Sequence, residues 1–597
     1  MKWFDKVKDR TWRWLFYLCL AGVSTTLTFR LHSDTGTLNW QSEIWADCAG
    51  YYIYMPATIL YGLDFDKFPD RIDEKTGYGF HLDPETRTFR TKYPIGVAVF
   101  AAPFFLGAAL IAQIAGIPLE GGFAPIFYRA ADLAAVFYLL LGLLFLQLVL
   151  ERYFRKITGY IVVLAVFLGT NLFFFTLRSP LMPHVFSFFL AALFINSIEK
   201  FTEKPSPERA WLLAFSLAFA ILVRPVNALL LVILAFWNVR SAKGFLERIR
   251  LLLTLRTIMV FVIAFAVAFI PQMLFWKYMY GKFIWYSYQG ESFSNWADPY
   301  FLEVWFAPLN GLFLYTPLFV LIVAGMTWSA IRREANGILL LVFFMVVSYT
   351  CAAWHSWFFG CGFGQRQFID YLPLFAFPLA FLFDRLYDAR RKILFFASLV
   401  LVVAASVYNV KMTKAAAGCF YGSSWDWPQF GRELARAGIC SIPEDRYVFT
   451  NDFENGVLSD RIFRTDSVVR SGMMSAQMDR GIEFNCRKSF YLYEFGKLAP
   501  AQADVSVWIW SARGPATGAH IVCWIDRGGQ TVSWQGAALD SLLTGAKVWT
   551  EVSATFTLPD SLRWDDMVSV NIWNPQRQLF FADDMKIIFT DANPKRP

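Results

Sequence analysis

The chain has 597 residues, of which 56% are hydrophobic and 17% charged, and its mean hydropathy is +0.41. Soluble domains carry about a quarter charged residues, so this composition excludes a chain that is soluble throughout and predicts extensive contact with lipid. The net charge of +8 does not indicate a nucleic-acid partner, because the basic residues stand in short clusters between apolar runs.

The first predicted element is a membrane span that begins at about residue 14. Five basic residues precede it, namely Lys2, Lys6, Lys8, Arg10 and Arg13. A cleaved signal peptide has the same outline, but no small-x-small cleavage site follows and further apolar runs come later. We therefore expect the first span to stay in the mature protein.

About eleven apolar segments approach the roughly 20 residues that a helix needs to cross hydrocarbon. The candidate spans are 14–31, 126–150, 157–176, 185–198, 210–223, 226–238, 256–276, 311–330, 337–353, 368–385 and 392–409. Segments that join them and carry most Lys and Arg are predicted to face the cytoplasm. The N-terminus is then inside, and everything after about residue 410 is outside.

One apolar segment, 94–116, does not fit this count. The basic stretch 151–156 places both of its ends on the outer side. We therefore predict a re-entrant or interface-lying helix there, which is tolerable where protein covers the backbone.

The first outer loop places an acid, Asp47, among tyrosines and ends with Lys92 and Tyr93. Most loop aspartates are only solvated, and Lys92 can be a snorkelling lysine at the interface. Other polar groups recur at the same predicted membrane face, which favours a site.

Further cations stand at that face. Arg178 and His184 lie between two apolar segments, and Arg224 precedes a proline within an apolar pair. A cation in such a position costs several kcal/mol unless it is paired or hydrated, so it is a functional candidate. The segment 354–373 combines tryptophans and glycines with His355 and Arg366. Tryptophans alone indicate an interfacial belt, whereas glycines allow close approach and arginine suits phosphate.

One acid and several cations at one face fit a lipid-linked phosphate whose tail lies in the membrane. A channel would show rings of repeated charge. A secondary transporter would show internal repeats and midplane ionisable groups, and we find no repeat.

The basic tail, the first span, Asp47 with its tyrosines, and Lys92-Tyr93-Pro94 before a helical bundle resemble the GT-C glycosyltransferases. The closer likeness is to the dolichyl-phosphate-mannose-protein mannosyltransferase and aminoarabinose transferase branch, over about residues 10–410. The resemblance implies a polyprenyl-phosphate sugar donor, a protein, lipid or glycan acceptor, and Asp47 as catalytic base. The predicted substrate-binding residues are Lys92, Tyr93, Arg178, His184, Arg224, Glu291, Asp298, His355 and Arg366.

The chain departs from that family at one point. Relatives carry a second acid in the next outer loop, where this chain has Arg178 and His184. Either Glu291 or Asp298 serves instead, or one carboxylate suffices. No clear metal-ligand spacing is evident, so a divalent cation at the active site stays open.

The composition changes after about residue 410, where charge rises and apolar residues alternate. The segments 506–510 and 568–573 alternate at period two, as half-buried strands do. We predict a β-sandwich whose ends resemble those of jelly-roll carbohydrate-binding modules. That resemblance makes Glu454 and Asp584 candidate calcium ligands, and a sandwich without ligand is an equal alternative. Among the eight cysteines, Cys419–Cys440 is the disulfide we expect first.

The sequence therefore predicts a polytopic helical membrane domain at 1–410, a linker at 411–445 and an extracytoplasmic sandwich at 446–597. The predicted function is glycosyl transfer at the outer face of the plasma (inner) membrane. A flippase for lipid-linked sugars and a non-catalytic glycan-binding scaffold are the alternatives.

Overall fold

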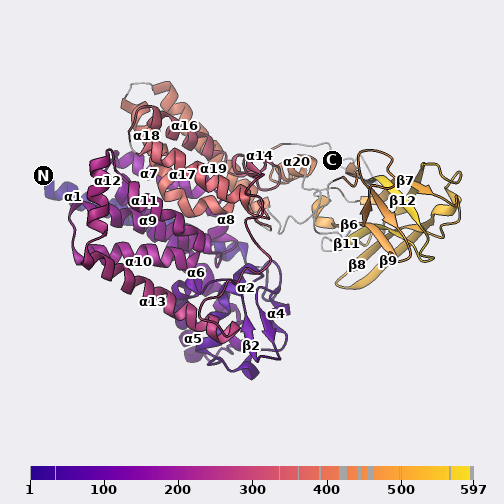
Figure 1. Ribbon diagram of the computed structural model, residues 1–597, viewed down its shortest axis with the longest axis horizontal. Helices are drawn as coiled ribbons and strands as arrows, with labels where there is room; N and C mark the ends of the chain where they lie inside the picture. The colour runs from indigo at the N-terminus through magenta and orange to yellow at the C-terminus, as the bar shows by residue number, and fades with distance from the viewer. Residues whose placement is uncertain are drawn as a thin grey trace. The chain divides into compact units, whose positions relative to one another are not determined.

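The computed structural model describes residues 2–33, 35–334, 336–360, 362–388, 392–415, 427–440, 446–454, 463–495, 498, 500–563 and 566–591. The chain divides into two compact units, Met1–Gly418 and Cys419–Pro597. The first is helical and the second is mainly β (Figure 1). The assignment of these units to a glycosyltransferase domain and a glycan-binding module stays a prediction.

The first unit is a bundle of apolar helices. Within the described residues, seven helices are long and apolar enough to cross a membrane. They lie in α1 (Lys2–Leu31), α5 (Gly96–Ala115), α6 (Pro125–Leu150, with the short η2 before it), α9 (Pro183–Glu203), α13 (Leu255–Tyr280), α18 (Leu372–Asp388, with η4 before it) and α19 (Lys392–Ala415). Shorter helices complete the bundle: α7 (Lys156–Leu168), α10 (Pro207–Val223), α11 (Leu230–Phe236), α16 (Leu318–Ile331) and α17 (Gly337–Ala353). The predicted polytopic helical class is confirmed.

Burial separates central from peripheral helices. The apolar windows of α9 and of η4 with α18 are 89% and 94% buried, whereas those of α1, α13 and α19 are 22% buried. Apolar side chains that no protein covers need lipid around them. Helices α1, α13 and α19 therefore face lipid, whereas α9 and α18 are surrounded by protein.

Several predicted spans are broken rather than continuous. The segment 157–176 contains α7 and then α8 (Leu172–Leu177), separated at Gly169. The segment 311–330 contains α15 (Leu312–Tyr315) and α16, separated at Thr316-Pro317 because proline supplies no backbone N–H. Likewise 226–238 begins as the 3₁₀-helix η3 (Pro225–Leu229) before α11. The sequence analysis did not predict these breaks in the helices.

Residues between α1 and α5 fold into a small segment, named the outer segment after the outer loop that the sequence predicts there. It contains α2 (Asp47–Tyr52), α3 (Tyr54–Ile59), η1 (Phe65–Lys67), α4 (Ile72–Lys75) and the hairpin β1 (His81–Asp83) with β2 (Thr88–Arg90). In Figure 1 the labels α2, α4 and β2 lie together beside α5. Buried Tyr52 and Tyr54 fill its interior.

Both flanks of α5 contact this one segment. On the N-terminal side, Tyr54 donates to the Tyr93 carbonyl at 2.7 Å. On the C-terminal side, Tyr52 and Tyr61 donate to the carbonyls of Gly122 and Gly121. If α5 does not cross the bilayer, both of its ends lie on one side and can contact the same segment, as they do here. The helix is nevertheless long enough to cross.

We predict that impermeant maleimide added from outside labels cysteines placed at Glu85 and at Glu120, one before and one after α5. Both positions are exposed, whereas Thr91 is buried and would not report. The variants are made in a Cys440→Ser background, because Cys440 is exposed. Peptide mapping assigns the label. Labelling at 120 only after permeabilisation would show that α5 crosses.

In its described residues, the second unit contains α20 (Trp427–Arg436) and ten strands. One sheet has the order β10-β7-β12-β5-β4, with β3 also paired to β12, and the other has the order β6-β11-β8-β9. The strands are β3 (Arg446–Asn451), β4 (Arg464–Thr465), β5 (Ser475–Met478), β6 (Phe484–Tyr491), β7 (Pro500–Ser511), β8 (His520–Arg527), β9 (Gln530–Ala538), β10 (Thr550–Thr557), β11 (Met567–Trp573) and β12 (Phe580–Asp591).

The two sheets share one apolar core. Phe490 of one sheet packs edge-on against Phe449 and Phe589 of the other. The predicted strands at 506–510 and 568–573 are confirmed as parts of β7 and β11, with alternating burial in β7. None of the six described cysteines forms a disulfide, and Cys419 of the predicted pair lies outside the described residues.

Candidate functional site

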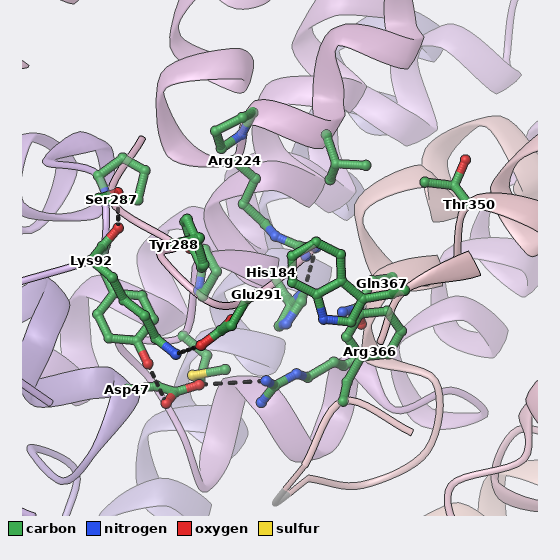
Figure 2. Close-up of a pocket in the computed structure, with 18 of the residues that line it drawn as sticks. Asp47, Lys92, His184, Arg224, Ser287, Tyr288, Glu291, Thr350, Arg366 and Gln367 are labelled. Carbon is green, nitrogen blue, oxygen red and sulfur yellow. Dashed lines mark hydrogen bonds and ion pairs between the residues drawn. The ribbon is translucent and has the colours of Figure 1, made fainter. Parts of the chain in front are cut away.

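A cavity of about 500 Å³ lies within the helical unit. Its walls come from α2, the N-terminal flank of α5, the ends of α9 and α10, and the loops around 276–293 and 354–371. Seven of the ten predicted site residues line it: Asp47, Lys92, Tyr93, His184, Arg224, Glu291 and Arg366. Figure 2 labels six of them, all but Tyr93, and shows their side chains around one space although they come from segments far apart in the sequence.

Asp47 begins α2, directly after a strained residue. Ala46 has φ 47° and ψ −121°, a conformation that non-glycine residues rarely adopt. Asp47 Oδ1 accepts a hydrogen bond from the Tyr93 hydroxyl at 2.5 Å, and Oδ2 lies 3.4 Å from Arg366 Nη2. The side chain remains 37% exposed. A phenol and a guanidinium thus orient the carboxylate without enclosing it.

Tyr93 is held firmly in that role. Its ring packs on Tyr51 at 4.6 Å between centroids. A Cβ on Gly50 would lie 2.2 Å from the Tyr93 ring and 2.3 Å from the Gly79 carbonyl, so only glycine fits there. Burial, and then the charge of Asp47, raises the pKa of Tyr93 well above its usual range. The phenol therefore keeps its proton and acts as a donor to Asp47.

Lys92 and Glu291 form an ion pair across the cavity wall. Lys92 Nζ lies 2.5 Å from Glu291 Oε1, and the Ser287 hydroxyl donates to the Lys92 carbonyl at 2.6 Å. The Lys92 ammonium also lies over the rings of Tyr93 and Tyr288. Both charged side chains are about a third exposed, so the pair contributes little to stability. Together with the Ser287 hydrogen bond, the pair joins the 281–300 loop to the outer segment.

The loop that carries Arg366 is tied down by buried amides. Asn310 Nδ2 donates to the Phe358 carbonyl at 2.9 Å, and Asn310 Oδ1 accepts from Gly364 N–H at 3.0 Å. Asn171 Nδ2 donates to the Phe363 carbonyl at 3.1 Å. Gly364 has φ +67°, and an added Cβ would lie 2.7 Å from Tyr315. These contacts place Arg366 at the start of η4 (Arg366–Tyr371) beside Asp47.

Asp370 is a site residue that sequence reasoning missed. Its side chain is fully buried on η4, one turn after Arg366, and it pairs with Arg224. Its Oδ1 lies 2.9 Å from His184 Nδ1. The signal was available, because an acid in an apolar segment needs a partner. Asp370 compensates the charge of Arg224 and fixes the ring of His184 at the cavity wall.

Three predicted residues do not line the cavity. Arg178 donates to the Lys414 carbonyl at 3.2 Å, and Asp298 is exposed in the loop after α13. His355 is exposed, with its ring against Trp354 at 4.9 Å between centroids. Their predicted roles in substrate binding stay predictions.

The predicted calcium ligands of the second unit have protein partners. Glu454 Oε1 accepts from the backbone N–H groups of Met473 and Met474 at 2.7 and 2.9 Å. Asp584 pairs with Arg470 and accepts from the Ser471 hydroxyl at 3.0 Å. In the described part of the chain, one group of three possible metal ligands lies close together, and it contains neither acid.

No protein-family model and no curated protein matches this chain. Among solved structures, the arabinosyltransferase EmbB from Mycobacterium smegmatis aligns with 95% of this chain at 12% identity and a TM-score of 0.32. The chain covers 64% of the length of that enzyme. The CBM22-1 xylan-binding domain of Paenibacillus barcinonensis Xyn10C aligns with 24% of this chain and is covered to 95%, at 10% identity and a TM-score of 0.17. At such identities and TM-scores, neither structure transfers a role to this chain or to any of its residues.

Proposed function

We propose that the chain is a membrane glycosyltransferase that moves a sugar from a polyprenyl-phosphate donor to an acceptor on the extracytoplasmic side. The observation that carries the proposal is the cavity in which one partly exposed carboxylate, Asp47, lies within 3.4 Å of the Arg366 guanidinium. Three cations and two carboxylates line this cavity together with many aromatic rings. Such a lining suits a substrate that is part sugar, part phosphate and part hydrocarbon.

The proposed reaction is a displacement at the anomeric carbon. The acceptor oxygen forms a new bond to that carbon, while the bond between carbon and the phosphate oxygen breaks. Asp47 accepts the hydroxyl proton as general base. The lipid phosphate leaves with the electron pair, and Arg366, Lys92 and Arg224 stabilise its charge. Tyr93 orients Asp47 for this step through its hydrogen bond.

The test is a transfer assay with purified protein in proteoliposomes. The substrates are polyprenyl-phosphate sugars labelled in the sugar, pentose and hexose, with a cell-envelope fraction as acceptor. We expect labelled glycan or protein together with free polyprenyl phosphate, because transfer cleaves the donor. A flippase would move the label across the membrane with the donor intact, and a scaffold would do neither. Either result in place of cleavage would overturn the proposal.

A specific observation also favours glycan binding by the second unit. On the outer face of sheet β6-β11-β8-β9, Trp573 stacks with Phe484 and meets Trp534 edge-on at 5.9 Å. Phe484 and Trp534 are about half exposed. Asn571, two residues before Trp573, is fully buried, yet neither of its amide atoms has a partner among the described residues. Nδ1 of His520 in β8 is likewise unpartnered.

An unsatisfied buried amide costs about 1–3 kcal/mol, and sugar hydroxyls can supply both a donor and an acceptor to it once the side chains that cover Asn571 move aside. Flat aromatic side chains beside the amide suit the apolar face of a sugar ring. We therefore propose that this face of the sandwich binds a polysaccharide segment.

We expect Trp573→Ala and Asn571→Ala in the full-length protein to weaken binding of soluble polysaccharides at least tenfold. Affinity electrophoresis against xylan, arabinan, mannan and glucan gives the readout. Trp510→Ala, on the outer face of the other sheet, is the matched control and should bind as the unaltered protein does. Equal binding by all variants would place any glycan site elsewhere.

A further inference from the structure

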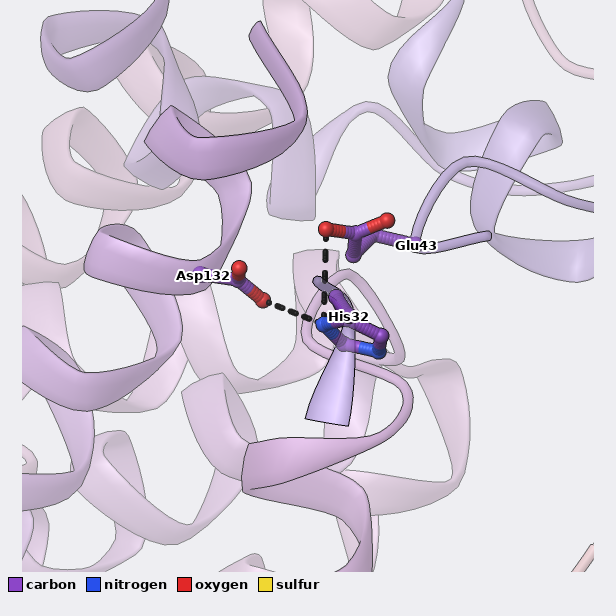
Figure 3. Close-up of side chains that lie close together, drawn as sticks. All are labelled: His32, Glu43 and Asp132. Atoms are coloured by element: carbon purple, nitrogen blue, oxygen red, sulfur yellow. Dashed lines mark hydrogen bonds and ion pairs between the residues drawn. The ribbon is translucent and has the colours of Figure 1, made fainter. Parts of the chain in front are cut away.

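A second cluster of charged side chains lies apart from the cavity. His32 directly follows α1, Glu43 lies in the outer segment, and Asp132 lies on α6 (Figure 3). Their exposed fractions are 5%, 2% and 0%. None of the three lines the cavity. Two buried carboxylates facing one imidazole are costly unless positive charge compensates them.

The geometry suits a metal ion. His32 Nδ1 lies 3.3 Å from Glu43 Oε1 and 3.1 Å from Asp132 Oδ1. In a tetrahedral zinc site, metal–ligand distances of about 2.0–2.2 Å place neighbouring ligand atoms roughly 3.3–3.5 Å apart. All three ligand atoms lie within 4.8 Å of one another. Figure 3 shows both carboxylates directed at the same ring nitrogen.

Few hydrogen atoms are available to the acceptors around this nitrogen. The Thr28 hydroxyl lies 3.0 Å from the Leu177 carbonyl and 2.8 Å from Asp132 Oδ1. Besides its one hydrogen and that of His32 Nδ1, the donor Arg129 Nη1 lies 3.6 Å from Glu43 Oε1, which is longer than a hydrogen bond. A cation between the ring nitrogen and the two carboxylates would supply a closer positive partner to both.

A second layer of donors orients the ligands from outside. Arg129 Nη1 lies 3.3 Å from Asp132 Oδ2, the oxygen that faces away from His32. Arg129 Nη2 donates to the His32 carbonyl at 3.0 Å. Metal-ligating carboxylates are commonly held by such outer partners.

We propose that His32, Glu43 and Asp132 bind one divalent transition-metal ion of the zinc class. The ion joins the end of α1, the outer segment and α6. Because Glu43 precedes Asp47 by four residues, the ion braces the segment from which the cavity's acid projects. Its role is structural, and the site does not depend on the proposed transferase activity.

The test is the metal content of full-length protein, purified without an affinity tag, incubated with ZnCl₂ and freed of excess metal. We expect about one zinc per chain by mass spectrometry. We expect His32→Ala and Asp132→Asn to lose it, while His81→Ala and His355→Ala, which remove exposed histidines, retain it. A strong chelator should lower the unfolding temperature of the unaltered protein and of the two controls only.

A protonated His32 that bridges both carboxylates is the outcome that overturns the proposal. In that case the unaltered protein holds no stoichiometric zinc, and neither zinc nor chelator shifts its unfolding temperature. Should His32→Ala fold poorly, Glu43→Gln replaces one carboxylate oxygen of a ligand by an amide nitrogen and gives the same comparison. Zinc retained by Glu43→Gln and by Asp132→Asn alike would also exclude this site.

Discussion

Asp47→Asn is expected to lower glycosyl transfer by about two orders of magnitude or more, because the amide cannot accept the acceptor's proton. The substitution keeps the shape of the side chain, and its oxygen can still accept the hydrogen bond from Tyr93. The helical unit should therefore keep its fold. Turnover of labelled donor, measured at saturating donor, gives the result, and the unfolding temperature reports the fold.

The matched control is Asp70→Asn, an exposed acid of the same outer segment whose loss should leave transfer unchanged. Glu43, the control that sequence spacing suggests, is unsuitable because it is buried and ion-paired with His32 and Arg129. Transfer at the unaltered rate in Asp47→Asn would remove Asp47 as the base. The proposed mechanism would then need another acid of the cavity, and Glu291 is the one that lines it.

Arg366→Lys is expected to weaken the donor's apparent affinity about tenfold or more, and Arg366→Ala more strongly. Lysine keeps the positive charge but loses the planar fork that holds two phosphate oxygens at once. KM and kcat for the polyprenyl-phosphate sugar measure the effect. Arg250→Lys, at an exposed position of the helix Ala242–Leu252, is the control for the exchange itself.

A second measurement separates phosphate binding from orientation of Asp47, since Arg366 also contacts that acid. Donor binding is compared between Asp47→Asn and Asp47→Asn/Arg366→Lys, where no catalysis intervenes. An arginine that binds phosphate should still lower the affinity in this background. Equal affinity of the two proteins would show that Arg366 acts through Asp47 alone.

The amino-acid sequence by itself determined the class of this protein and selected Asp47 as the acid for which we propose the catalytic role. Long apolar runs predict which segments contact lipid, because an apolar helix that no protein covers is stable only in lipid. Alternation of apolar and polar residues likewise predicted the strands that the structure has as β7 and β11. A charged or hydrogen-bonding side chain next to an apolar run costs free energy unless it has a partner or a function. For this reason the sequence could select Asp47, Lys92, Tyr93 and Arg366.

Tertiary structure alone decided which of these groups meet. The Lys92–Glu291 pair joins residues 199 positions apart, and Arg366 reaches Asp47 across 319 positions. The partner of Asp370 and the meeting of His32, Glu43 and Asp132 likewise follow only from the packing of the helices. The reason is that periodicity states which face of a helix is buried but not which helix covers it. Packing and rotation of the helices, with their breaks at Gly169 and Pro317, set those partnerships.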